Sequence, residues 1–418
     1  MASFISWQRR WVGVLVVLCV SGTLRAQERT PLKVAVFAFV PDASAAIKRL
    51  EADFEKAHPS IDLDVELWDP YSDSIDDDGL EQLTEFDVAE IDVCRIDDLI
   101  AGVYGGIDEI PDFALPAAGG LLPPARTLRN SNRGRYAVPH LVCGNFLVFR
   151  TTDTTLKNAK TFTEILAALD GDGGKPLCVD LWGSTGLGEF YTDAVIDQFG
   201  AAEAETHLLA ISAQPAGETA TLKPEAANAV IRLVGEMSKE RREHLSFYHA
   251  QSFIYPRDFS NAPHAALLGY SERLYYAERE MQLNPPGLLP SFKQDDLVVR
   301  PFTFAETSKG TPTWIDGFVV PRGKLAAKRG AILAFLSFIQ SKTGFHAFAQ
   351  PTITFASSYL LPASTDVLFE ARTTQPTLAA YAAVLDDSFP VIDARVWRAM
   401  RRAGDALKPQ IKAKYPQK

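Results

Sequence analysis

The sequence predicts an α/β protein with a largely parallel sheet and two hydrophobic cores. A strand, a helix and a second strand follow one another after residue 30, and amphipathic helices recur along the rest of the chain. Such alternation is typical of parallel sheets covered by helices. The 418 residues exceed the size of one ordinary domain, which favours two cores over one. With 47% apolar and 22% charged residues, the composition indicates a globular protein and argues against extensive disorder.

The N-terminal residues have the three parts of a secretory signal. Arg9 and Arg10 precede an apolar stretch at 11–20, and small and polar residues follow up to Ala26. This order predicts cleavage after Ala26, so that residues 1–26 are a signal peptide. The apolar stretch is too short to span a bilayer, and no later run is long enough. We therefore expect a soluble protein that is exported to the periplasm or the medium.

The first unit after the signal is the basis for the parallel sheet. Residues 32–40 are almost all apolar and predict a buried strand. A turn follows, and then a helix in which Leu50 and Phe54 recur at helical spacing and which ends before Pro59. In 61–68 apolar and mostly acidic residues alternate, which predicts a second strand.

Further helices are predicted by apolar residues spaced at three and four positions. They are expected at 161–169, 189–199, 224–237, 325–340 and 391–407. The glycine-rich string at 183–188 is not followed by the lysine of a phosphate-binding loop, and we interpret it as a turn before the second of these helices. No spacing of cysteine and histidine suggests zinc, so we expect neither a metal nor a cofactor.

The cysteines raise the question of a free thiol. Removing Cys19 with the signal leaves Cys94, Cys143 and Cys178, which cannot all pair within one chain. A disulfide between Cys94 and Cys178 would leave Cys143 free, and three separate buried thiols are the alternative. Cys143 stands beside a glycine in an apolar run after Pro139. That run predicts a buried strand whose thiol can face a cleft.

The formal net charge of −10 limits the partners of the protein. It disfavours nucleic acid and anionic membrane surfaces, because both repel an acidic protein. It mildly favours a cationic ligand, without identifying one.

The order of these elements resembles that of the periplasmic solute-binding proteins, in which the chain crosses several times between two α/β lobes. The resemblance implies the type II two-lobe fold, a monomer, and an interlobe cleft for the ligand with Cys143 on its wall. It implies crossings near 139–145, 267–273 and 319–325. Lobe 1 is then expected to comprise 27–139 and 273–322, and lobe 2 to comprise 140–272 and 323–418.

A closer resemblance is to thiaminase I, a family of secreted bacterial enzymes with the same two lobes. Five segments carry it in the same order, namely 37–42, 68–71, 138–150, 269–272 and 359–363. The cysteine segment and Gly269-Tyr270-Ser271-Glu272 are the specific ones, because they match the nucleophile and the base of the family. The resemblance therefore implies that Cys143 attacks as a thiolate and that Glu272 removes its proton.

That family displaces the thiazole of thiamine from its pyrimidine methylene by an amine, a pyridine or a thiol, through a covalent cysteine adduct. The resemblance thus implies thiamine and a small nucleophilic co-substrate as partners. It places Asp92 and Asp316 near the rings, for hydrogen bonding to the pyrimidine and attraction of the thiazolium. Aromatic walls are expected from Phe37, Phe39, Tyr71, Tyr270 and Trp314.

Some residues depart from the family pattern. Phe37, Phe39 and Trp314 stand where the family carries tyrosines, so ring surface is kept while hydroxyl groups are lost. His140 precedes Cys143 by three positions, which places the two side chains on opposite faces of a regular strand. The alternative function is a periplasmic solute-binding protein for thiamine or a related pyrimidine, without catalysis. Covalent modification of Cys143 separates the two functions.

Overall fold

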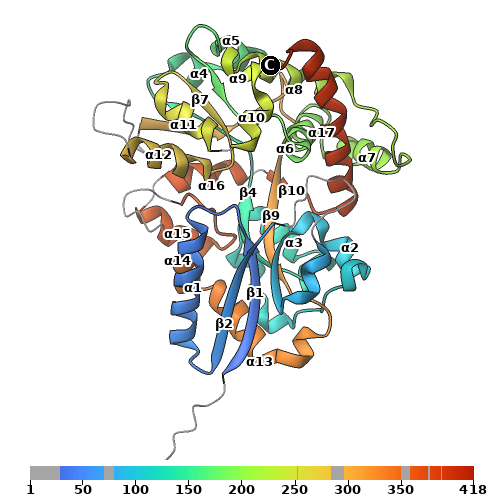
Figure 1. Cartoon of the computed structure of the whole chain (residues 1–418), viewed down its shortest axis with the longest axis vertical. Helices are drawn as coiled ribbons and strands as arrows, with labels where there is room; N and C mark the ends of the chain where they lie inside the picture. Colours follow the sequence, from blue (N-terminus) through green and yellow to red (C-terminus); the bar gives the residue numbers. More distant parts are fainter. Residues whose placement is uncertain are drawn as a thin grey trace, which may run out of the picture.

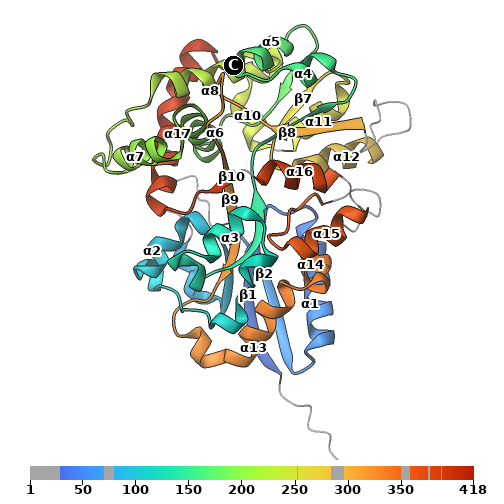
Figure 2. The same ribbon diagram turned by 180° about the vertical axis from the view of Figure 1, so that it is seen from behind.

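The computed structural model describes residues 29–69, 80–251, 253–283, 296–349, 358–374, 377–386 and 388–418. They form two lobes, drawn one above the other in Figures 1 and 2, and each lobe is built around its own sheet. This is the expected two-lobe α/β fold. The expected signal peptide lies outside the described residues. Within them, no helix combines the length and the apolar character that a membrane crossing requires.

The sheet of the lower lobe has the order β10-β9-β3-β1-β2, with β4 also paired to β9. Its strands are β1 (Thr30–Phe37), β2 (Ile61–Trp68), β3 (Val88–Asp92), β4 (Val138–Cys143), β9 (Thr311–Val319) and β10 (Ser388–Pro390). β1 runs parallel to β2 and β3, whereas β9 is antiparallel to β3 and β4. The helices of this lobe are α1 (Ala43–Ala57), α2 (Ile96–Ile100), α3 (Pro123–Arg129), α13 (Lys324–Ile339) and α14 (Lys342–Ala349).

The first strand, helix and strand form the predicted parallel unit. α1 buries Ala46, Leu50 and Phe54, which are the positions that helical spacing directs to one face. Along β2, the buried residues Ile61, Leu63 and Val65 alternate with more exposed ones, and the alternation ends at Leu67, which is exposed, and Trp68, which is buried. The residue pattern therefore fixes which face of each element meets the core.

The sheet of the upper lobe has the order β6-β7-β5-β8. Its strands are β5 (Phe146–Arg150), β6 (Leu177–Cys178), β7 (Ala266–Gly269) and β8 (Leu297–Pro301). The helices around it are α4 (Thr154–Asn158), α5 (Phe162–Ala168), α6 (Ser184–Phe199), α7 (Ala201–Ser212), α8 (Pro224–Gly235), α9 (Lys239–Glu243), α10 (Leu245–Ala250), α11 (Ile254–Asn261), α12 (Arg273–Leu283), α16 (Thr377–Leu385) and α17 (Ala394–Lys414). α15 (Thr365–Thr374) lies nearer the boundary between the lobes in Figure 1.

The chain passes from one sheet to the other between β4 and β5, at Gly144 and Asn145. The apolar run after Pro139, expected to be one strand, is therefore two short strands in different sheets. The sequence reads as one apolar run because the strands on both sides of the passage are buried. Cys143 is the last residue of the first strand.

The later division of the chain differs from the expected one. β8 pairs with β5, so residues 297–301 belong to the upper sheet and not to lobe 1. The chain returns only between β8 and β9, because α12 packs against α11 of the upper lobe. α13 then stays in the lower lobe, where Ile332, Phe335 and Leu336 enter its core. The expected crossings near 267–273 and 319–325 are therefore wrong, and 323–418 does not lie in a single lobe.

α6 begins earlier than predicted, because the glycine-rich string forms its first turns. Gly188 lies where α6 crosses α17, and a Cβ there would stand 1.9 Å from the carbonyl oxygen of Met400. A Cβ on Gly404 of α17 would stand equally close, 1.9 Å from the carbonyl oxygen of Ser184. The two glycines thus allow the helix backbones to touch.

Gly404→Ala is expected to lower the free energy of unfolding by about 1–3 kcal/mol, because the added methyl must push α6 and α17 apart. The matched control is Gly330→Ala in α13, where a Cβ would meet no atom within 4 Å. That change should raise the free energy of unfolding by roughly 0.5–1 kcal/mol, since alanine favours the helix. Denaturant unfolding of both variants provides the measurement. Equal effects would contradict the close crossing.

Candidate active site

Three neighbouring strands of the lower sheet bring Cys143 next to two acids. Cys143 pairs with Trp314 of β9, and Asp316 of the same strand pairs with Asp92 of β3. The thiol of Cys143 donates a hydrogen bond to Oδ2 of Asp316, with Sγ and Oδ2 3.4 Å apart. The carboxylate of Asp92 accepts a bond from the backbone N–H of Cys94 at 2.9 Å. The predicted nucleophile and both predicted acids therefore lie together.

Glu272 and Tyr270 reach the same place from the upper lobe. They follow β7, whose last residue Gly269 pairs with Phe146, the first residue of β5 after the passage between the lobes. The carboxylate of Glu272 is close enough to raise the pKa of the Cys143 thiol and of Asp316. The structure thus brings the residues of the two specific sequence segments together at the boundary of the lobes.

The Cys143 thiol is held in its neutral form. Burial raises its pKa well above the usual range, and the carboxylates of Asp316 and Glu272 raise it further. Cys143 is nevertheless partly exposed, whereas Cys94 and Cys178 are buried. All three are free thiols, so the disulfide between Cys94 and Cys178 does not form. The alternative of three buried thiols holds for Cys94 and Cys178 and not for Cys143. Cys143 needs a base before it can attack.

Asp316 and Glu272 differ in the charged groups that surround them, and therefore in how readily each carboxyl group holds a proton. Burial raises the pKa of Asp316 well above its usual range, and the nearby acids Asp92 and Glu90 raise it further, so Asp316 holds a proton more readily than an exposed aspartate does. Burial also raises the pKa of Glu272, but Arg273 opposes it, with Nε 3.7 Å from Oε1 of Glu272. Glu272 is therefore better suited to accept the thiol proton, and Asp316 to donate one.

Further acids make the site strongly favourable for a cation. Burial raises the pKa of Asp92 to about 6 and that of Glu189 in α6 to about 7. Each of these carboxyls ionises more easily when a positive charge lies nearby. A cationic ligand therefore gains attraction from several carboxylates at once.

The raised pKa values predict how the stability of the ligand-free protein depends on pH. The folded protein binds protons at Asp92 and Glu189 more tightly than the unfolded chain does, because both pKa values lie above the ordinary values of these side chains. This contribution is fully present below about pH 4 and is lost as the pH rises through about 6 and 7. It amounts to on the order of a few kcal/mol. The free energy of unfolding should therefore fall from pH 5 to about pH 8.

Asp92→Asn tests this prediction, because asparagine still accepts the bond from Cys94 but does not titrate. Its free energy of unfolding should depend less steeply on pH over the same range. Chemical denaturation at several pH values measures both slopes. A wild-type stability that rises between pH 5 and 8 would contradict the prediction.

The predicted aromatic residues occupy different environments. Phe37 ends β1 and is buried in the core cluster that also contains Trp68 and Ile91. Trp314 of β9 is buried and pairs with Cys143 of β4, while Tyr270 is partly buried. The remaining two candidates are Phe39, which is 43% exposed, and Tyr71, which lies outside the described residues. Trp314 and Tyr270 are thus the candidates that lie beside Cys143 and Glu272.

His140 takes part in a different contact, inside the lower lobe. Its Nδ1 lies 2.6 Å from Oε1 of Glu90, and its ring packs between Phe318 and Phe348. Among the described residues, His140 makes these contacts and none with Cys143, in agreement with the expected opposite orientation. Glu90 was not predicted, and it also accepts a bond from the backbone N–H of Phe37 at 3.1 Å.

Sequence reasoning also missed Glu189, Asn145 and Asp193. The amide nitrogen of Asn145 donates to Oε1 of Glu189 at 2.9 Å and to Oδ2 of Asp193 at 2.7 Å. The hydroxyl group of Tyr270 donates to Oε2 of Glu189. The signal that could have found Glu189 and Asp193 is their spacing of four in α6, which places the two acids on one face of the helix.

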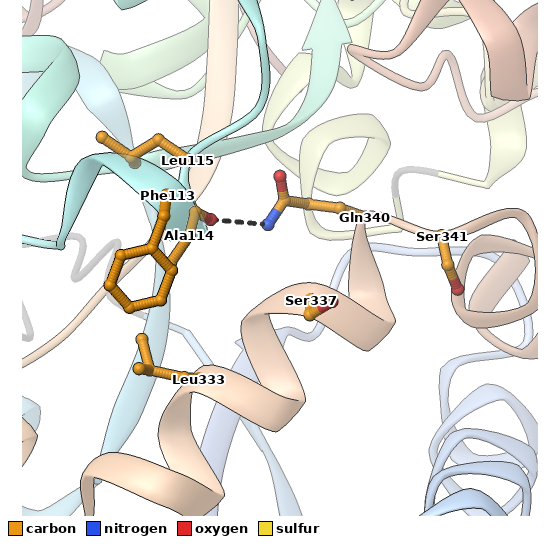
Figure 3. Close-up of a pocket in the computed structure, with 7 residues that line it drawn as sticks. All are labelled: Phe113, Ala114, Leu115, Leu333, Ser337, Gln340 and Ser341. Atoms are coloured by element: carbon orange, nitrogen blue, oxygen red, sulfur yellow. Dashed lines mark hydrogen bonds between the residues drawn. The ribbon is translucent and has the colours of Figure 1, made fainter.

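A separate hollow lies on the lower lobe, between a short turn at Asp112–Ala114 and α13 (Figure 3). Phe113 and Leu333 line it, and Nε2 of Gln340 donates to the carbonyl oxygen of Ala114 at 3.3 Å. None of its lining residues was predicted as a site residue. Among the described residues, no group of three side chains is arranged to hold a metal ion.

Solved structures share this architecture. Thiaminase I from Bacillus thiaminolyticus is 18% identical and covers 91% of this chain and 99% of its own, with a TM-score of 0.70. Thiaminase I from Clostridium botulinum, in complex with thiamin, is 19% identical and covers 91% and 100%, with a TM-score of 0.71. The maltose-maltodextrin binding protein of Alicyclobacillus acidocaldarius is 12% identical and covers 91% and 96%, with a TM-score of 0.56.

Comparison of the amino-acid sequence alone finds no relative. No family model matches the sequence, and no curated protein matches it. At these identities the likeness establishes the fold, which is that of two-lobe proteins related in architecture to both thiaminase I and sugar-binding proteins.

Proposed function

We propose that this protein is an exported transferase that cleaves thiamine, with Cys143 as nucleophile. The observation that carries the proposal is the meeting of Cys143, Asp316 and Glu272 at the boundary between the lobes. A thiol beside two carboxyls of different proton affinity suits nucleophilic catalysis better than simple capture of a ligand. The shared fold with thiaminase I agrees with this function.

In the proposed reaction, Glu272 takes the proton of Cys143 and the thiolate adds to the electron-poor pyrimidine ring of thiamine. A carbon–sulfur bond forms, and the added electron density moves into the ring, where Asp316 donates a hydrogen bond or a proton to a ring nitrogen. The bond between the methylene and the thiazolium nitrogen then breaks, and the thiazole leaves as a neutral molecule with that electron pair.

The second half of the reaction transfers the pyrimidine to the co-substrate. An amine, a pyridine or a thiol attacks the methylene carbon, and any proton that it loses passes to a carboxylate of the site. The carbon–sulfur bond to Cys143 then breaks, which restores the thiol once Glu272 returns its proton. No cofactor enters the balance of this reaction.

The remaining site residues have roles in binding the substrate. Asp92 attracts the cationic thiazolium, and Trp314 and Tyr270 provide ring surface for the two heterocycles. Phe37, Phe39 and Tyr71 are proposed to contribute aromatic contacts from the lower lobe. We propose that the mature enzyme is a monomer in the periplasm or the medium, where thiamine and the nucleophile reach it by diffusion.

The test incubates purified mature protein with thiamine and an acceptor such as pyridine or aniline, and follows thiazole release by chromatography. Release that depends on both thiamine and protein supports the proposal. The second candidate is a binding protein for thiamine or a related pyrimidine, favoured by the fold shared with sugar-binding proteins. Tight binding of thiamine without thiazole release across several acceptors would favour that candidate.

A further inference from the structure

One carboxylate of the upper lobe connects the two segments that carry the proposed nucleophile and base. Glu189 of α6 is 6% exposed, and each of its oxygens accepts a hydrogen bond. Oε1 accepts from the amide of Asn145 at 2.9 Å, and Oε2 accepts from the hydroxyl group of Tyr270. The donors come from parts of the chain that are far apart in sequence but adjacent in the fold.

These two donors stand next to the reacting groups. Asn145 follows Cys143 by two residues, at the passage from β4 to β5. Tyr270 precedes Glu272 by two residues, directly after β7. Within the described residues, Glu189 is hydrogen-bonded to neither Cys143 nor Glu272, but it is bonded to a side chain two positions from each of them.

We infer that Glu189 is a positioning residue, whose ionised carboxylate fixes Asn145 and Tyr270 and thereby holds Cys143 and Glu272 in reacting geometry. This inference rests on the proposed function. A buried carboxylate is costly unless it is well hydrogen-bonded, and here both oxygens are bonded. Hydrogen bonds to a charged acceptor are also stronger than those between neutral groups.

Ionisation matters because only the carboxylate accepts two bonds. A protonated Glu189 carries one donor and so competes with the proton of Asn145 or Tyr270. The groups that share the hydrogen bonds of Glu189 or interact with it electrostatically include Asn145, Asp193, Tyr255, Tyr270, Glu272 and Asp92. Burial, together with Asp92 and Glu272, raises the pKa of Glu189 to about 7. The hydrogen bonds from Asn145 and Tyr270 to Glu189 therefore become stronger as the pH rises through about 7.

Glu189→Gln separates this role from simple packing. Glutamine has the same shape but carries one acceptor and one donor at every pH, as protonated glutamic acid does. The wild type and the variant should therefore behave alike near pH 5.5 and differ by roughly tenfold near pH 8, the size expected for one charge-assisted hydrogen bond. In the transfer reaction, kcat should fall while KM changes little.

The readout that does not depend on thiamine is the alkylation of Cys143 by iodoacetamide across this pH range, with the modified peptide identified by mass spectrometry. The matched control is Asp193→Asn. Asp193 shares the amide of Asn145 but makes no hydrogen bond to Tyr270 within the described part of the chain, and asparagine still offers an oxygen to that amide. Burial raises the pKa of Asp193 well above its ordinary value. This control should keep the wild-type dependence on pH.

Superimposable pH profiles of the wild type and Glu189→Gln, with folding intact by circular dichroism, would overturn the inference. A loss of the pH dependence in Asp193→Asn equal to that in Glu189→Gln would also overturn it, because the effect would then belong to the network and not to Glu189. If the wild type does not cleave thiamine, yet alkylation shows the expected difference between wild type and Glu189→Gln, the proposed function fails and the positioning role stands.

Discussion

Cys143→Ser should lower the rate of thiamine cleavage by about a thousandfold or more, while thiamine still binds. Serine preserves the size of the side chain but is a far weaker nucleophile here. In the part of the chain that the structure describes, the side chain at this position is bonded to Asp316 and to no histidine that could activate a hydroxyl group. The loss should appear in kcat, since the acids and rings that bind the substrate are unchanged. Steady-state kinetics and calorimetric titration with thiamine measure the two effects.

The matched control for this variant is Cys178→Ala. Cys178 ends β6 in the core of the upper lobe and is 2% exposed, so its removal should affect stability and leave the transfer rate near that of the wild type. Turnover by Cys143→Ser at the wild-type rate would exclude the cysteine mechanism, even if thiamine proved to be the substrate.

Glu272→Gln and Asp316→Asn should both impair transfer, but in different ways. Loss of the base should lower kcat by about a hundredfold to ten-thousandfold and remove the low-pH limb of the rate profile. Asp316→Asn should lower kcat by roughly a hundredfold to a thousandfold, because asparagine can donate a hydrogen bond but no proton. It should keep the low-pH limb, since Glu272 is still present. Profiles of kcat/KM against pH distinguish the two roles.

The opposite result would reassign the two acids. Asp316 is the group that accepts the thiol hydrogen bond, at 3.4 Å, so it competes with Glu272 for the role of base. If Asp316→Asn loses the low-pH limb and Glu272→Gln keeps it, then Asp316 removes the proton of Cys143. The control for folding is the circular dichroism spectrum of each variant.

The parallel unit at the start of the mature chain could be predicted because its signals are local. The helical spacing of Leu50 and Phe54 and the alternation in 61–68 are properties of neighbouring residues. The passages between lobes are not local. β8 joins the upper sheet because β5 offers it a free edge, and nothing within residues 297–301 specifies that partner.

The site residues also divide into those that the sequence could indicate and those that depend on contacts between distant segments. Cys143 is an unpaired cysteine beside a glycine in the sequence, and the resemblance to thiaminase I adds Asp92 and Asp316. The structure brings the three residues together on neighbouring strands. Glu189 did not stand out, because a glutamate in a helix is usually an exposed residue. Its burial results from contact with Tyr270, 81 positions away, and with the residue at the passage between the lobes. Such a role depends on tertiary contacts that no local pattern encodes.

The most direct measurement of the proposed mechanism is the mass of the protein after mixing with thiamine alone, without acceptor, and rapid acid quenching. The mechanism predicts a gain equal to the pyrimidinylmethyl group, located on the peptide that contains Cys143, and release of thiazole in equal amount. Unmodified Cys143 with thiamine recovered intact, under conditions where thiamine is bound, would contradict the mechanism and favour a binding protein.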